Sequence, residues 1–192
     1  MPMVMMLVVF MSAFIVYTYK RDMLEYQCEQ IDANLTYSLL ASAVVNLTEY
    51  AQSGNLVIAD GGEPECGDRA FLEAYLSFVD CLKCNMSLDG NMENLNSAGL
   101  CGNVEIVFYK IYNYIADEEG FHVVECGISG GQAYTVRHAD DKPVRVRANG
   151  GTVEICETSV CAEISFNIDG IGEYSLTRLV AVTDKNKEGG ER

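Results

Sequence analysis

The chain has 192 residues, a formal net charge of −15 and eight cysteines, and it contains no tryptophan. Nucleic acids and anionic membrane surfaces are polyanions, so this charge speaks against both as partners. Eight cysteines in a chain of this length suit an oxidising compartment, such as the outside of a cell. The length is enough for one long helix and one globular domain with its own core.

The first nineteen residues carry no charged side chain, and their only polar side chains are those of Ser12, Tyr17, Thr18 and Tyr19. As an α-helix this segment spans about 28 Å, close to the thickness of a bilayer's hydrocarbon core. Three interpretations compete: a cleaved secretory signal, a permanent membrane anchor, or a helix buried among copies of itself. For the third, the residues expected in the shared core are Met1, Met3, Val4, Met5, Leu7, Val8, Phe10, Met11, Phe14 and Ile15.

The residues that flank this segment bear on the choice. A signal peptide begins with a basic region and ends in small residues, whereas no basic residue precedes this run and Lys20, Arg21 and Asp22 follow it. A membrane anchor keeps its basic flank in the cytoplasm, which would place the cysteine-rich remainder there. Removal of a short basic leader before Met1, as in prepilins, would resolve this conflict. The gene sequence tests that hypothesis.

An amphipathic pattern continues the helix through residues 20–52. Neither proline nor glycine occurs between residues 3 and 53, and Gly54 is a natural stop. We therefore expect one helix over residues 1–52, with its first third apolar all round. The apolar positions of the later part recur at steps of three or four: Leu24, Cys28, Ile31, Leu35, Leu39, Ala43, Leu47 and Tyr50.

Residues 53–102 are expected to form a helix and a cysteine-rich loop region. A second helix is predicted at about 69–84, because Phe71, Tyr75, Phe78 and Leu82 fall on one face. Residues 85–102 are rich in Asn, Gly and Ser and indicate an irregular loop. Asp89, Asn91 and Glu93 within it hint at calcium ligation, but the remaining positions of an EF-hand loop are missing.

From residue 103 to 184 the pattern is typical of antiparallel strands joined by short turns. The clearest hairpin is VRVRANGGTVEICE, with an Asn-Gly turn. The spacing predicts a sandwich or a strongly curled sheet, and residues 185–192 a polar tail. The fold class is thus α+β: a long helix, then a mainly antiparallel β head with one short helix. The expected strands are 104–115, 121–128, 132–138, 143–148, 152–157, 160–168 and 173–183.

The cysteines are interpreted as a disulfide framework that staples the head. Cys81 and Cys84 have the CxxC spacing of a metal or dithiol site, with Cys156 and Cys161 as further ligands. The two pairs are far apart in sequence and include no histidine, so disulfides are favoured. Cys28 is expected to clamp the head to the long helix. The disulfide candidates are Cys28, Cys66, Cys81, Cys84, Cys101, Cys126, Cys156 and Cys161.

Three Asn-x-Ser/Thr sequons, at Asn34, Asn46 and Asn85, are candidates for N-glycosylation, with unmodified asparagines as the alternative. The two histidines, His122 and His138, belong to no catalytic motif, and no phosphate-binding glycine loop is present. The sequence therefore predicts no enzyme, no metal site and no cofactor.

The organisation of the whole chain resembles the type IV pilin superfamily, and in particular its archaeal pilin and archaellin branch. The resemblance rests on the apolar start at 1–19, its amphipathic continuation and the β head. It implies removal of a leader by a prepilin peptidase, extraction from the membrane and helical assembly with the apolar helices at the filament centre. Bacterial members usually carry a glutamate at the fifth mature position, where this chain has Met5, and this favours the archaeal branch.

The expected function is that of a structural subunit of an extracellular, cell-surface filament for adhesion or attachment. Its partners would be copies of itself in a helical homopolymer, the membrane before assembly, and glycans. The first alternative is a single-pass, membrane-anchored extracellular binding domain or a minor pseudopilin of a secretion system. A third is a metal or redox protein that uses Cys81 and Cys84.

Overall fold

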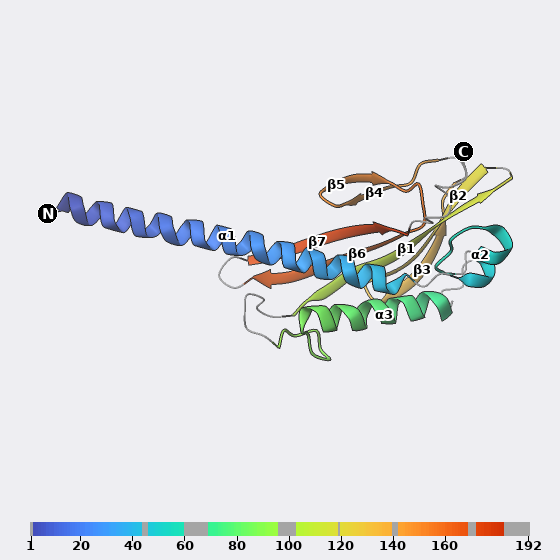
Figure 1. Ribbon diagram of the computed structural model, residues 1–192, viewed down its shortest axis with the longest axis horizontal. Helices are drawn as coiled ribbons and strands as arrows, with labels where there is room; N and C mark the ends of the chain where they lie inside the picture. Colours follow the sequence, from blue (N-terminus) through green and yellow to red (C-terminus); the bar gives the residue numbers. More distant parts are fainter. Residues whose placement is uncertain are drawn as a thin grey trace, which may run out of the picture.

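The computed structural model shows a long helix that projects from a compact head (Figure 1). It describes residues 2–43, 46–59, 69–95, 103–118, 120–139, 142–168 and 172–182. The residues Met1, Cys66 and Cys101 and the expected tail at 185–192 lie outside these ranges. The helices are α1 (Pro2–Ser42), α2 (Leu47–Ser53) and α3 (Arg69–Met86), and the strands are β1 (Glu105–Asp117), β2 (Gly120–Ser129), β3 (Gln132–Arg137), β4 (Arg145–Ala148), β5 (Gly151–Glu154), β6 (Ser159–Ile168) and β7 (Gly172–Ala181).

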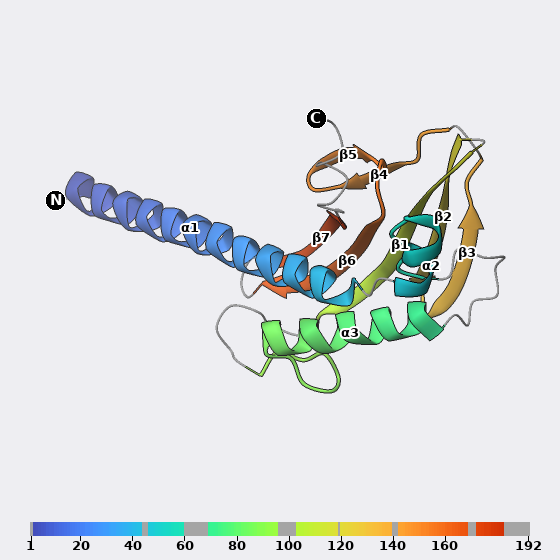
Figure 2. The ribbon, with the colours of Figure 1, turned by 45° about the vertical axis from the view of Figure 1, so that its right-hand side comes forward.

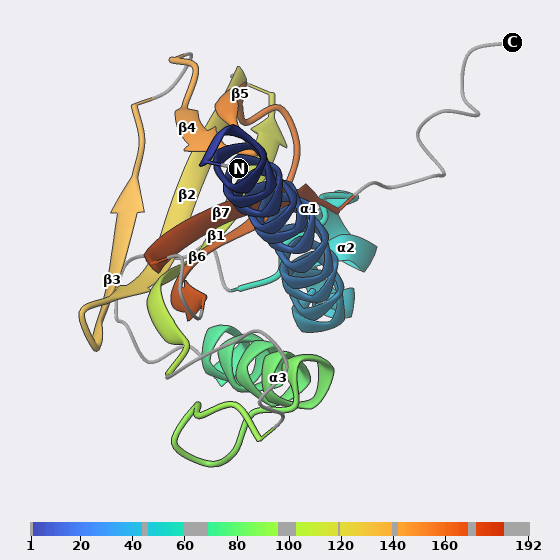
Figure 3. The ribbon, with the colours of Figure 1, turned by 90° about the vertical axis from the view of Figure 1, so that its left-hand side faces the viewer.

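The head is built on a five-stranded antiparallel sheet with the order β3-β2-β1-β6-β7. The α+β fold class is confirmed. The expected sandwich is not found, because α1 and α3 cover one face of the sheet and supply the apolar surface that a second sheet would otherwise provide (Figure 3). The β4–β5 hairpin forms a separate two-stranded sheet.

The main core lies between the two helices and the sheet. Leu35 and Leu39 of α1 and Phe78 and Leu82 of α3 are fully buried there. The ring of Tyr109 on β1 lies 5.0 Å from that of Phe78. The two helices run in opposite directions alongside each other (Figure 2). Only the later part of α1 therefore belongs to the head.

The opposite face of the sheet carries a smaller apolar cluster beneath the β4–β5 hairpin. Tyr112, Val123 and Cys161 of the sheet pack there against Ala148 and Ile155. The hairpin turn is formed by Asn149 and Gly150, both with positive φ, at 54° and 73°, as the Asn-Gly turn predicted. The hairpin leaves part of this face uncovered, and that part forms the polar cleft described below.

The structure divides the helix expected over residues 1–52. α1 ends at Ser42, and Asn46 begins α2. The Asn46 backbone N–H donates to the Val57 carbonyl oxygen at 2.7 Å, while its Oδ1 accepts from the N–H groups of Thr48 and Glu49 at 3.1 and 3.2 Å. Asn46 is thus an N-cap. Its N–H is committed to a residue beyond α2 and cannot continue the helical ladder. Gly54, with φ of 71°, ends α2 as expected.

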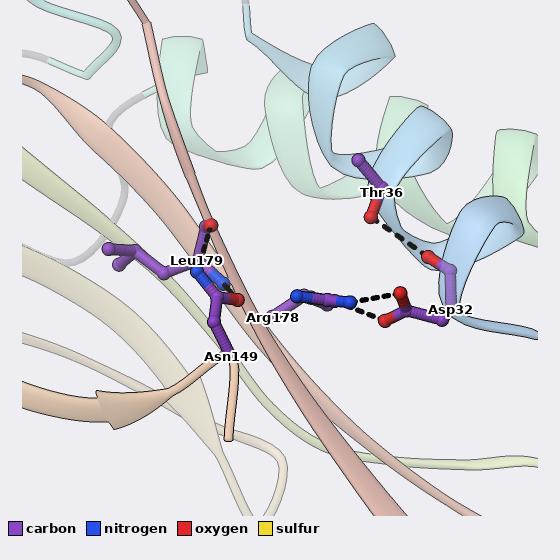
Figure 4. A network of polar contacts seen from close by, with 5 residues as sticks. All are labelled: Asp32, Thr36, Asn149, Arg178 and Leu179. Atoms are coloured by element: carbon purple, nitrogen blue, oxygen red, sulfur yellow. Dashed lines mark hydrogen bonds and ion pairs between the residues drawn. The ribbon is translucent and has the colours of Figure 1, made fainter. Parts of the chain in front are cut away.

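Two polar contacts fix β7, one to α1 and one to the hairpin (Figure 4). Arg178 of β7 forms a two-pronged ion pair with Asp32 of α1. Asn149 donates its N–H to the Thr177 carbonyl and its side-chain amide to the Leu179 carbonyl, at 3.1 and 3.0 Å. Its Oδ1 also accepts from the Leu179 N–H at 3.1 Å. Asn149 therefore bonds the outer edge of β7 as a neighbouring strand would.

The expectation of a disulfide-stapled head is wrong for the cysteines that the structure describes. No disulfide joins Cys28, Cys81, Cys84, Cys126, Cys156 or Cys161. Cys126 and Cys161 belong to the clusters on opposite faces of the sheet. Cys81 and Cys84 are one helical turn apart, where Cβ atoms are about 5–6 Å from each other and a disulfide needs about 3.8 Å. The thiol of Cys28 is unpaired and packs at the edge of the main core, so apolar packing and the Asp32–Arg178 pair, not a disulfide, attach α1 to the head.

Candidate functional site

The first candidate site is the free end of α1, which we call the apolar segment (residues 3–19). Its large apolar side chains are exposed, from 54% for Met11 to 84% for Met3. Every expected core residue from Met3 to Ile15 lies there, and Met1 is outside the described part of the chain. α1 projects beyond the sheet there (Figure 1), and these side chains are not buried by the described part of the head.

The two aliphatic hydroxyl groups in the apolar segment are satisfied within the helix. Ser12 Oγ donates to the Val8 carbonyl at 2.8 Å, and Thr18 Oγ1 donates to the Ile15 carbonyl at 2.9 Å. The hydroxyl groups of Ser12 and Thr18 therefore need no hydrogen-bond partner outside the helix. Apart from the phenols of Tyr17 and Tyr19 at its end, the surface can be covered by apolar material.

This exposed surface is too large for a soluble monomer. Burial of one large apolar side chain is worth about 1.5–3 kcal/mol, and monomers seldom expose a continuous apolar patch larger than a few hundred Å². In the described part of the chain, α1 is the helix whose length and composition would suffice to cross a membrane. Lipid or other protein must cover the apolar segment.

The second candidate site is a polar cleft of about 770 Å³ beneath the β4–β5 hairpin. Its floor is the open part of the sheet face, with Lys110 and Phe108 of β1 and Glu163 of β6. Arg145 and Arg147 of the hairpin line its other side. Charged and apolar groups thus face the same space, as is typical of a binding site for a small polar ligand.

A buried carboxylate organises this cleft. Glu125 is 8% exposed and accepts hydrogen bonds from Lys110 Nζ at 3.0 Å and from the Tyr134 hydroxyl at 2.9 Å. His138 Nε2 lies 2.9 Å from its other oxygen. Tyr134 reaches over the strand because Gly127 has no side chain: a Cβ atom there would lie 2.6 Å from the tyrosine ring.

The charges in this cluster stabilise one another. Burial opposes ionisation of Glu125, but the hydrogen bonds from Lys110 and His138 outweigh it and hold the pKa of Glu125 below its usual value. Burial likewise disfavours the charged form of Lys110, but the contacts with Glu125 and Tyr134 raise the pKa of Lys110 above its usual value. The cluster is therefore an ion pair at neutral pH, and it joins β1, β2 and the residue that follows β3.

Neither the phenol of Tyr112, which lines the cleft, nor the thiol of Cys161, which lies in the smaller apolar cluster beneath the hairpin, is activated. Burial raises the pKa of Cys161 to about 12, and burial also raises the pKa of Tyr112. Both stay protonated at neutral pH and are weak nucleophiles. Among the residues that the structure describes, no three side chains of His, Cys, Asp or Glu are close enough to hold a metal ion.

The three sequons lie at different places. Asn34 is half-buried on α1, and Asn46 caps α2. Asn85, at the end of α3, donates its side-chain amide to Ser38 Oγ of α1 at 3.1 Å, so a glycan there would replace a contact between the two helices. Asp89 accepts from the backbone N–H groups of Asn91 and Glu93 at 2.8 and 2.9 Å, as in an ordinary loop.

Sequence reasoning did not identify the cluster around Glu125. Lys110, Glu125 and Tyr134 lie on three different strands, and His138 ends the expected strand 132–138 without a catalytic motif around it. One signal was present: Lys110 and Glu125 are charged residues inside otherwise apolar runs, and a buried charge needs a partner.

The chain was compared with protein-family models, with curated proteins and with solved structures. Nothing matches in any of the three comparisons. The two candidate sites are therefore the features of the protein that bear on its function.

Proposed function

We propose that the chain is a structural subunit of an extracellular filament of the type IV pilus kind, built by lateral packing of the apolar segments of many copies. The heads would lie outermost and serve attachment to surfaces. The observation that carries the proposal is the complete exposure of the apolar segment on a helix whose later part is held firmly in the head.

Packing against other copies fits this segment better than permanent residence in lipid. A span flanked by Lys20 and Arg21 tends to keep that flank in the cytoplasm, so permanent residence in lipid would hold the head inside the cell. The segment is also rich in methionine, whose flexible side chain fills irregular gaps between helices. Membrane residence then precedes assembly.

Contacts between copies in such a structure are heterologous, since the covered faces of one helix meet different faces of its neighbours. Heterologous contacts that do not close produce an open helical polymer. A parallel bundle of apolar segments would bury their side chains without lipid and leave the heads, with their negative charge, in water.

A second function is favoured by the polar cleft: a single-pass, membrane-anchored extracellular domain that binds a small polar ligand. In that case the apolar segment stays in lipid and the cleft around Glu125 and Lys110 is the working site. The two functions differ in what covers the apolar segment.

Electron microscopy of the purified full-length chain separates them. After detergent is removed, a filament subunit forms helical fibres in which the apolar segments pack together at the centre. An anchored ectodomain instead gives discrete particles, each with its apolar segment in detergent or in a lipid disc. Separate particles under all conditions of detergent removal would overturn the filament proposal.

A further inference from the structure

A band of charge begins on α1 directly after the apolar segment. Lys20 and Arg21 are followed by Asp22, Glu25 and Glu29, and all five side chains are exposed. Within the described part of the chain they form no ion pair with one another or with the head. The next acidic residue, Asp32, is already held by Arg178. The head thus supplies an opposite charge for Asp32. The five charged residues before Asp32 have no such partner in the described part of the head.

Lys20 lies on the opposite side of the helix from the acidic residues of this band. At about 100° per residue, Asp22, Glu25 and Glu29 fall within a sector of about 60°, which we call the acidic stripe. Lys20 lies about 180° from the middle of that stripe. Arg21 lies about 40° from Glu25 and one turn before it, within reach on the same helix. Lys20 has no acidic residue three or four positions away on its own helix, so it cannot form an ion pair within α1.

Assembly through the apolar segment brings these bands together, because the band starts one residue beyond that segment. If neighbouring parallel helices packed in register, Lys20 of one copy would face the stripe-bearing side of the next but would lie about 3–14 Å from the acidic residues along the axis. A shift along the axis places Lys20 of one copy level with the acidic stripe of the next.

We propose that Lys20 of each copy contacts the acidic stripe of its neighbour and thereby sets the stagger between adjacent subunits. This inference rests on the proposed filament function. With a rise of 1.5 Å per residue, the separation of Lys20 from Asp22 and from Glu29 corresponds to an axial offset of about 3–14 Å. Because the contacting faces lie on opposite sides of the helix, each copy keeps one free donor face and one free acceptor face, and the chain of contacts stays open.

Charge reversal in the full-length chain tests the contact. The first variant, Lys20→Glu, places acid against acid. The second variant reverses the stripe with Asp22→Lys, Glu25→Lys and Glu29→Lys, and places base against base. Each variant alone should give at least about tenfold less sedimentable fibre than the wild type, because juxtaposed like charges are strongly unfavourable. A 1:1 mixture of the two should recover fibres, since every contact between alternating copies again pairs opposite charges.

Matched controls carry the same changes in net charge on the head. Lys142→Glu corresponds to the first variant, and Asp80→Lys with Glu118→Lys and Glu157→Lys corresponds to the second, because all four side chains are exposed. These controls should form fibres as the wild type does.

The outcomes separate the inference from the function. Normal fibres from Lys20→Glu alone, or a mixture that stays soluble, would overturn the Lys20 contact while wild-type fibres still support the filament function. A wild-type chain that forms no fibres would overturn both. Recovery in the mixture excludes misfolding as the cause of failure, since a misfolded variant is not repaired by another chain.

Discussion

The two parts of α1 are one continuous helix, yet they differ in what covers them. Residues 24–42 place their apolar stripe against α3 and the sheet, with Leu35 and Leu39 fully buried. The apolar segment at residues 3–19 adds no residue to the cores formed by the described part of the chain and exposes every large side chain. The later part finds its cover within the chain, whereas the apolar segment must find it in lipid or in other chains. The difference teaches that the head is complete without the apolar segment, and that the segment is a surface for association.

The largest expected effect is the loss of fibre formation when a charge is placed in the apolar segment. Phe14→Lys should abolish fibre formation, because a charge buried without a partner costs several kcal/mol. Fibres are counted by electron microscopy and measured by sedimentation. Leu76→Lys on α3 is the matched control, since Phe14 and Leu76 are both 58% exposed in the single chain. Fibres from Phe14→Lys as abundant as those of the wild type would exclude the apolar segment from the contact.

The next effect concerns the covered part of α1. Leu35→Ala should lower the free energy of unfolding of the head by about 2–5 kcal/mol, because it leaves a cavity in the core. Urea unfolding followed by circular dichroism in detergent measures this change. Leu40→Ala on the same helix is the control, because Leu40 is 47% exposed, and its effect should be below about 1 kcal/mol. Equal losses at both positions would contradict the packing described for α1.

A smaller effect should come from the ion pair that joins α1 to β7. The side chains of Asp32 and Arg178 are partly exposed, at 23% and 31%, so Asp32→Asn should cost about 1 kcal/mol of unfolding free energy. Glu29→Gln, which removes an exposed carboxylate without a described partner, should cost almost nothing. In a double-mutant cycle, Arg178→Gln should add little once Asp32 is replaced. Fully additive losses would show that the pair contributes no coupling.

The smallest effect is a pH dependence of the free energy of unfolding of the head. The pKa of Glu125 is lowered in the folded chain. Near this pKa the folded chain therefore binds fewer protons at Glu125 than the unfolded chain does. Its contribution is fully present above the unfolded pKa of about 4.3 and is lost as the pH falls from there through the folded value. Glu125→Gln should therefore be less stable at neutral pH and should show a shallower loss below about pH 4.3.

Unfolding curves measured at several pH values check this slope. The contacts of Glu125 with Lys110, Tyr134 and His138 are the ones lost on protonation. Residues 3–19 contain no carboxylate, amine or imidazole side chain, so apolar packing of this segment does not itself titrate in this range, and any acid sensitivity of fibre formation should come from the acidic stripe. An unchanged slope in Glu125→Gln would assign the acid sensitivity to other groups.

Local patterns in the sequence predicted most of the elements. Periodicity identified α3 and the apolar face of α1, and the Asn149-Gly150 dipeptide predicted the hairpin turn. The end of α1 at Ser42 was not predicted, since it depends on a hydrogen bond from Asn46 to Val57, across the whole of α2. A break of this kind has no proline or glycine to announce it.

The site around Glu125 could not be predicted because strand register creates it. The pairing of β2 with β3 places Gly127 opposite Tyr134, and the pairing of β1 with β2 places Lys110 opposite Gly127. A shift of one residue in either pairing would send these side chains to the other face. The disulfide framework was predicted from the number and spacing of the cysteines, and sequence does not show that Cys126 and Cys161 face opposite sides of the sheet.

The contact of Asn149 with β7 has a consequence for how copies avoid one another. An open edge strand offers its N–H and C=O groups to any foreign strand, which is a common route to aggregation. At Thr177 and Leu179 those groups are already occupied by a turn residue of the same chain. Heads crowded at high local concentration therefore cannot pair into a shared sheet along this stretch, and in the proposed filament the contacts for growth would lie on α1.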